Sequence, residues 1–156
     1  MADSSDDILS KELAKLGSWS GRLGSLLGGG DADAGEKVTS LSVQLTARFL
    51  ATERYTEKFA CAHPADKVLK YGYSVLSKLG AMQNPPDAAL PYPFLSAVIG
   101  SGFRNLNPAL VYFEILESGD SSCVVTITGA AKEGLIKQHT AEKAVKRVIT
   151  ELNSVL

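Results

Sequence analysis

The sequence predicts an α+β fold: a two-layer sandwich in which two helices cover one face of an antiparallel meander sheet of four or five strands. Three observations support this expectation. Apolar and polar residues alternate in several short segments, as in half-buried strands, while two longer segments repeat their apolar residues at helical spacing. The connections between the later strands are too short for parallel crossovers, so neighbouring strands should run antiparallel.

The individual elements follow from local signals along the chain. Alternation predicts a first strand at residues 53–62, and a helix should begin around Pro64, because proline costs nothing in a first turn, and end at Gly80. Consecutive prolines then mark a loop. Further strands are expected at residues 94–99, 110–116 and 123–128, the last two joined by a tight turn at 117–121. The closing helix should bury a stripe made of Ala141, Val145, Val148, Ile149, Leu152 and Val155.

The chain is expected to have two parts. Residues 1–37 should form a flexible, Gly- and Ser-rich N-terminal arm with a short helix near its start, because ordering so many glycines is costly. An alternative is that the arm is an amphipathic peptide, whose Trp19 and neighbouring leucines dock onto a partner or membrane surface. Residues 38–156 should form a single α+β domain, in which the apolar pattern of 38–51 fits a strand or a helix.

Charge and composition limit the classes of partner. The 156 residues carry 16 Lys+Arg against 17 Asp+Glu, a net charge of −1. Nucleic acids and anionic membranes call for a concentrated basic surface, so no nucleic-acid partner is expected and only the arm would support membrane binding. The N-terminus is acidic where a secretory signal would be basic, and the apolar runs fall short of the ~18 residues of a membrane span. We therefore expect a cytoplasmic protein.

The element order resembles two known arrangements. Strand, helix, meander and long C-terminal helix over residues 53–156 resemble the helix-grip and TATA-box-binding-protein-like folds, in which a curved antiparallel sheet wraps a C-terminal helix. Residues 100–109 and 129–138 resemble segments of small uncharacterised bacterial domains. This resemblance implies a fold and no activity, so it supplies no catalytic residues.

The sequence contains no recognisable catalytic site, and no cofactor or metal is expected. Neither His63 nor His139 lies in a metal-binding spacing, and the glycines of Gly100-Ser101-Gly102 lack the third glycine of a dinucleotide fingerprint. Cys61 and Cys123 are the only cysteines. Because they lie in apolar, strand-like contexts, we expect buried core thiols rather than a disulfide framework.

Two polar segments form the candidate binding site. The first contains Arg104, Asn105 and Asn107, and the second contains Lys132, Lys137 and His139. Strand polarity should bring both segments to one end of the sheet, where their donors would form a small basic pocket for an anionic ligand. The alternative is turn architecture alone, with Arg104 paired to Glu133 or Glu142.

These observations favour a non-enzymatic binding module for a small apolar or anionic ligand. A cleft between the sheet and the last helix would be lined by Phe94, Val98, Val111, Phe113, Val125 and Ile127, although the same residues could equally form a closed core. The alternative is a protein–protein interaction or assembly domain, which would use the N-terminal arm or an exposed sheet face with Tyr55, Leu110 and Tyr112.

Overall fold

A computed structural model of the chain describes residues 5–15, 51–84, 94–101, 107–133 and 138–156. Residues 5–15 are helical. The other elements are β1 (Ala51–Cys61), α3 (Ala65–Leu79), β2 (Gly80–Asn84), β3 (Phe94–Ser101), β4 (Asn107–Ser118), β5 (Cys123–Glu133) and α4 (Thr140–Asn153). None of the described helices is long and apolar enough to cross a membrane.

The chain divides into two compact units. The first comprises Met1–Thr52 together with Lys132–Lys137, and the second comprises Glu53–Ala131 together with Gln138–Leu156. Most of the predicted arm and the undecided segment 38–50 lie outside the described residues. The described start of the arm contains the short helix expected there.

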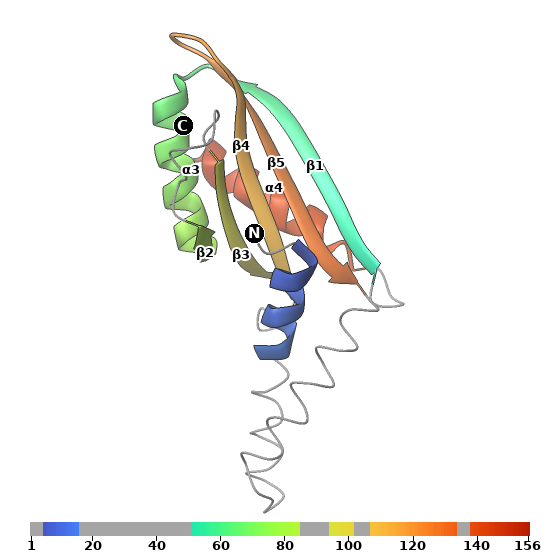
Figure 1. The fold of residues 1–156 in the computed structure, drawn as a ribbon. Helices are drawn as coiled ribbons and strands as arrows, with labels where there is room; N and C mark the ends of the chain where they lie inside the picture. Colours follow the sequence, from blue (N-terminus) through green and yellow to red (C-terminus); the bar gives the residue numbers. More distant parts are fainter. Residues whose placement is uncertain (1–4, 16–50, 85–93, 102–106, 134–137) are drawn as a thin grey trace, which may run out of the picture. The chain divides into compact units, whose positions relative to one another are not determined.

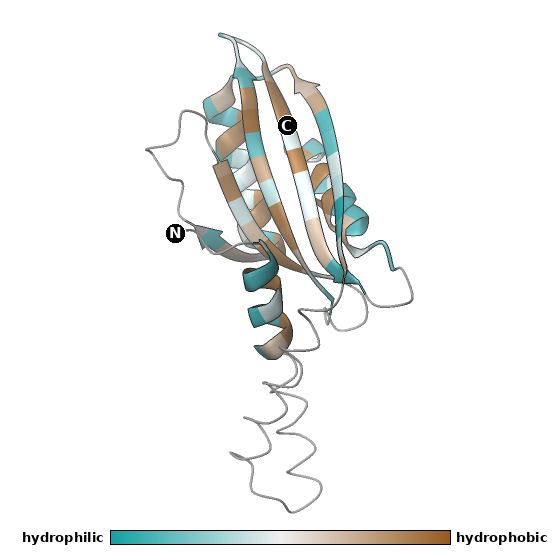
Figure 2. Cartoon of the chain, turned by 45° about the vertical axis from the view of Figure 1, so that its right-hand side comes forward, coloured by the Kyte–Doolittle hydropathy of each residue, from teal (hydrophilic) through white to brown (hydrophobic). Residues whose placement is uncertain are grey.

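The second unit holds the predicted α+β sandwich. Its five strands are ordered β1-β5-β4-β3-β2, so β2 to β5 form an antiparallel meander and β1 pairs with β5 (Figure 1). The helices α3 and α4 cover the same face of this sheet (Figure 1). The predicted α+β fold and its helix-grip-like arrangement are therefore confirmed. Polar and apolar residues alternate along β4 and β5, as the sequence pattern required (Figure 2).

Strand β2 is the element that the sequence pattern missed. Gly80 ends α3 as expected, but its backbone is extended, with φ −165°, and the chain passes directly into a strand. Gly80 is registered with Ile99 of β3. A Cβ atom at Gly80 would lie 2.1 Å from the carbonyl oxygen of Val98, so glycine is required by this close approach of two backbones. The strand was missed because its five residues carry no alternation long enough to detect.

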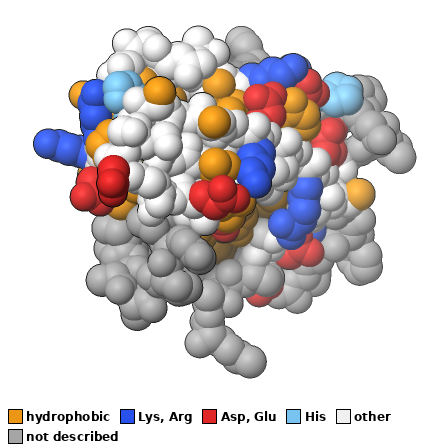
Figure 3. Space-filling model, turned by 90° about the horizontal axis from the view of Figure 1, so that it is seen from above, with side chains coloured by type: hydrophobic (Ala, Val, Ile, Leu, Met, Phe, Trp, Pro, Cys, Tyr) orange, Lys and Arg blue, Asp and Glu red, His pale blue; other side chains and the backbone are white. Residues whose placement is uncertain are grey.

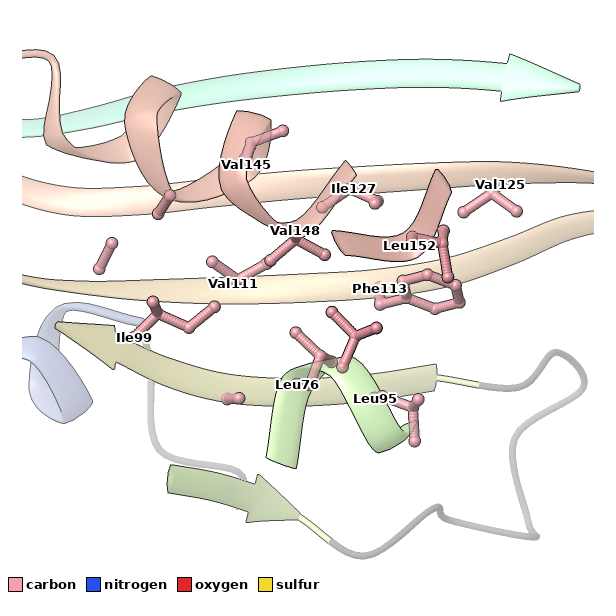
Figure 4. Close-up of a cluster of buried hydrophobic side chains, with 14 of the residues drawn as sticks. Leu76, Leu95, Ile99, Val111, Phe113, Val125, Ile127, Val145, Val148 and Leu152 are labelled. Carbon is pink, nitrogen blue, oxygen red and sulfur yellow. The ribbon is translucent and has the colours of Figure 1, made fainter. Parts of the chain in front are cut away.

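The core lies between the sheet and the two helices. Its side chains come from both layers: Leu76 from α3, Val111 and Phe113 from β4, Ile127 from β5, and Val145, Val148 and Leu152 from α4 (Figure 4). All seven are fully buried. The space between the sheet and the last helix is filled by these side chains, so over the described residues it is a closed core rather than a ligand cleft.

Two details of the predicted core are wrong. In β3, Leu95, Ala97 and Ile99 face the core, whereas Phe94 and Val98 lie on the opposite face. Alternation could not decide between the faces because both carry apolar residues. In the last helix, Val155 is 44% exposed, since α4 ends at Asn153.

Candidate functional site

Three of the six predicted site residues fall within the described parts of the chain: Asn107, Lys132 and His139. Arg104, Asn105 and Lys137 lie outside them.

Strand register brings the described ends of the two predicted segments together. Asn107 begins β4 opposite Ser101, and two residues further on Ala109 pairs with Ala131 near the end of β5. The amide nitrogen of Asn107 donates a hydrogen bond to the side-chain oxygen of Gln138, which lies just before α4. The start of β4 and the segment leading into α4 thus meet at one end of the sheet, as strand polarity required.

His139 stands at this end among carboxylates. It adopts a left-handed backbone conformation, with φ 54°, immediately before the first turn of α4. Its Nδ1 atom lies 3.4 Å from Glu53 Oε1 and 3.7 Å from Glu142 Oε2. Lys146 is a cation on α4, and its Nζ atom lies 2.6 Å from Glu142 Oε1. A hydrogen bond from Lys146, together with its positive charge, lowers the pKa of Glu142.

Lys132 has an acidic neighbour as well. Within the first unit its Nζ atom lies 3.3 Å from Asp6 Oδ1, and Thr52 donates a 2.7 Å hydrogen bond to the same oxygen. Lys132 has the carboxylate of Asp6 close by, and, in the second unit, His139 has those of Glu53 and Glu142 close by. A cation that already faces a carboxylate attracts an added anion less strongly than an isolated one.

A groove between α3 and β3 is a second candidate site. It has a volume of about 350 Å³ and is lined by Asp66, Leu69, Lys70 and Tyr73 of α3 and Leu95 of β3. Tyr73 is 48% exposed although it is a large aromatic residue. Leucine side chains and the tyrosine ring form an apolar floor, while Asp66 and Lys70 supply polar groups at the surface. The arrangement suits a small molecule with an apolar body and a polar substituent.

The sequence contains a signal for this groove outside the buried stripe of α3. The four lining residues of α3 are spaced three, four and seven residues apart, so they share one helix face. That face lies beside the buried stripe of Val68, Gly72, Val75 and Leu76. Tyr73, an aromatic residue on the edge of the buried stripe, is the sequence feature that indicates the groove.

Over the described ranges, no group of three or more His, Cys, Asp or Glu side chains is placed to hold a metal ion.

Comparison with known proteins returns similar folds only. No known protein family matches the sequence, and no curated protein does either. A truncated norcoclaurine synthase from Thalictrum flavum aligns with 68% of this chain and 94% of its own, at 10% identity and a TM-score of 0.43. A START superfamily protein from Mycobacterium smegmatis aligns with 65% of this chain and 95% of its own, at 8% identity and a TM-score of 0.40. A conserved protein of unknown function from Enterococcus faecalis aligns with 67% and 71%, at 10% identity and a TM-score of 0.41. Similarities this weak say nothing about the ligand or activity of this chain.

Proposed function

We propose that this chain is a non-enzymatic binding module for a small, mainly apolar ligand, and that the groove between α3 and β3 holds it. The observation that carries the proposal is the groove itself, whose volume of about 350 Å³ lies in the range of small-molecule sites. The closed core between the sheet and α4 leaves no room for the ligand there over the described residues.

The residues that line the groove would contribute to binding in different ways. The exposed ring of Tyr73 offers a flat apolar surface for stacking, and Leu69 and Leu95 form the floor. Lys70 would attract an acidic substituent of the ligand, and Asp66 at the same surface would disfavour a second negative charge. A ligand with an apolar ring system and a single acidic group fits these residues best.

The alternative of an interaction domain that uses the bare sheet face has less support. Tyr55 packs against the core on the helix-covered side, with Lys146 Nζ 6.0 Å from its ring centroid. Tyr112 stacks on Phe94, with ring centroids 5.6 Å apart, and Leu110 is buried. Of the three residues expected to form a common contact surface, Tyr55 is therefore on the core side, whereas Leu110 and Tyr112 are on the opposite face of the sheet. The cytoplasmic location predicted from the sequence stays a prediction.

The proposal can be tested with 8-anilino-1-naphthalenesulfonate, an apolar ring probe that carries one sulfonate. The full chain should bind it saturably, and the amide NMR signals of Leu69, Tyr73 and Leu95 should shift during the titration. Tyr73→Ala should weaken binding about tenfold, which corresponds to about 1.4 kcal/mol of lost stacking and contact area. Ser74→Ala is the matched control, because Ser74 is exposed on the same helix and does not line the groove.

Two results would contradict the proposal. One is equal affinity of wild type and Tyr73→Ala for the probe. The other is a set of shifted NMR signals that maps away from α3 and β3.

A further inference from the structure

The two cysteines, far apart in the sequence, are brought together by the pairing of β1 with β5. Cys61 is the last residue of β1 and Cys123 is the first residue of β5, and these strands are neighbours in the sheet. The hydroxyl oxygens of Thr56 and Thr128 lie 3.0 Å apart across the same pair of strands. Cys61 lies five residues further along β1 and Cys123 five residues back along β5, so an antiparallel register places the cysteines opposite each other.

The faces of the strands agree with this pairing. Thr56 and Thr128 point away from the core. Each is five positions from the cysteine on its strand, and an odd offset puts two residues on opposite faces, so both cysteines point into the core. Both belong to the core cluster, with exposures of 7% and 3%. Cys61 also raises the pKa of the Cys123 thiol, second to the effect of burial, as a close thiol neighbour would. Residues directly opposite in an antiparallel pair have Cα atoms about 4.5–5.5 Å apart, which is within the range of disulfides.

A hollow in the surface lies beside one of the two cysteines. It has a volume of about 240 Å³ and is lined by Ala60, Glu117, Ser118, Gly119, Ser122, Cys123 and Val124. It lies at the hairpin between β4 and β5, where Gly119 N–H donates a 2.7 Å hydrogen bond to the Ser122 carbonyl. The small side chains of this hairpin leave the hollow open. Seen from this end, acidic, basic and apolar side chains are interspersed (Figure 3).

We propose that Cys61 and Cys123 form a reactive dithiol site, which a small molecular disulfide converts into a Cys61–Cys123 disulfide through the hollow at the β4–β5 hairpin. In the first step the Cys123 thiolate attacks one sulfur of the reagent, which forms a mixed disulfide and releases one thiolate. In the second step Cys61 loses its proton and attacks the Cys123 sulfur, which releases the other half of the reagent. Two protein thiols are oxidised, the reagent is reduced to two thiols, and the protons of the cysteines end on those thiols.

The modification has a defined structural consequence. β1 lies at an edge of the sheet and its last residue leads into α3. A bond between Cys61 and Cys123 would hold the end of this edge strand to β5, so fraying of β1 would be suppressed. Because burial raises the pKa of the Cys123 thiol, the reaction should be slow at neutral pH and faster as the pH rises and more thiolate forms.

The test uses bis(2-hydroxyethyl) disulfide, which is small and uncharged, on the folded full-length chain. Wild type should lose both free thiols, gain no lasting adduct, and give a Cys61–Cys123 linked peptide in a non-reducing digest. Amide exchange in β1 should slow after oxidation, and dithiothreitol should reverse the change. Cys61→Ala should instead stop at a stable mixed disulfide on Cys123, and Cys123→Ala should react at least about tenfold more slowly than wild type.

Circular dichroism establishes whether each variant is folded, and Cys61→Ser and Cys123→Ser replace any alanine variant that is not. The proposal is overturned if folded wild type accumulates adducts on both cysteines, or if its thiols react only in denaturant. It is also overturned if Cys123→Ala reacts as fast as wild type.

Discussion

Gly129→Ala tests how closely α4 lies on the sheet. Gly129 lies in β5 opposite Val111, on the face that α4 covers. A Cβ atom there would lie 2.7 Å from the Ala141 carbonyl oxygen and 2.9 Å from Val145 Cγ2. The carbonyl belongs to the helix backbone and cannot rotate away as a side chain can, so the helix itself would have to shift.

The size of the effect follows from two opposing contributions. Overpacking a well-packed core usually costs about 1–3 kcal/mol. Replacing glycine by alanine in a strand recovers about 0.5–1 kcal/mol of backbone entropy. We therefore expect Gly129→Ala to lower the free energy of unfolding by about 1–2 kcal/mol. Urea unfolding followed by circular dichroism measures this as a lower midpoint with an unchanged slope.

Gly119→Ala is the matched control. A Cβ atom at Gly119, in the exposed β4–β5 turn, would have its nearest neighbours at 3.6 Å, which is ordinary van der Waals contact. Its free energy of unfolding should stay within about 0.5 kcal/mol of wild type. Val145→Ala should cost less in the Gly129→Ala background than in wild type, because it removes one of the two close contacts. Equal midpoints for Gly129→Ala and Gly119→Ala would refute the reasoning.

Three further predictions concern the helices and the arm. Leu152→Ala, at a fully buried position of α4, should lower the free energy of unfolding, measured in urea, by about 2–5 kcal/mol. The control Lys143→Ala changes an exposed residue of the same helix and should stay within about 0.5 kcal/mol of wild type. Equal effects of the two changes would mean that the buried helix face is misassigned. A hydrogen bond from Lys78, 2.7 Å away on α3, lowers the pKa of Glu151 in the folded chain. The pair therefore stabilises the fold at pH values above 4.5, the ordinary pKa of glutamate, and this stabilisation is lost as the pH falls below that value. Glu151→Gln should therefore flatten the loss of thermal stability on acidification through this range, and an unchanged pH profile would contradict it. A chain that begins at Glu36 should unfold cooperatively, with a Tm within a few degrees of that of the full chain, because the core cluster lies wholly in later residues. Loss of cooperative unfolding would show that the arm belongs to the core.

Local patterns in the sequence were enough for the type and order of most elements. Proline at the start of α3, glycine at its end and the apolar stripe of α4 each act over a few residues, so they can be read without knowing the fold. The short connection between β4 and β5 likewise dictated an antiparallel hairpin. Strand β2 was not predicted, because it is a strand through its pairing with β3 and has no strand-like pattern in its own residues.

The candidate sites depended on contacts that no local pattern reveals. The sequence placed Cys61 and Cys123 in apolar strands, but only the order of the strands and their register put one opposite the other. The groove beside Tyr73 needed β3 to pass under the α3 face that carries it. The inward face of β3 was decided by which side the helices cover, since both sides are apolar. Periodicity states which residues of an element share a face, whereas the neighbour of that face is set by long-range packing.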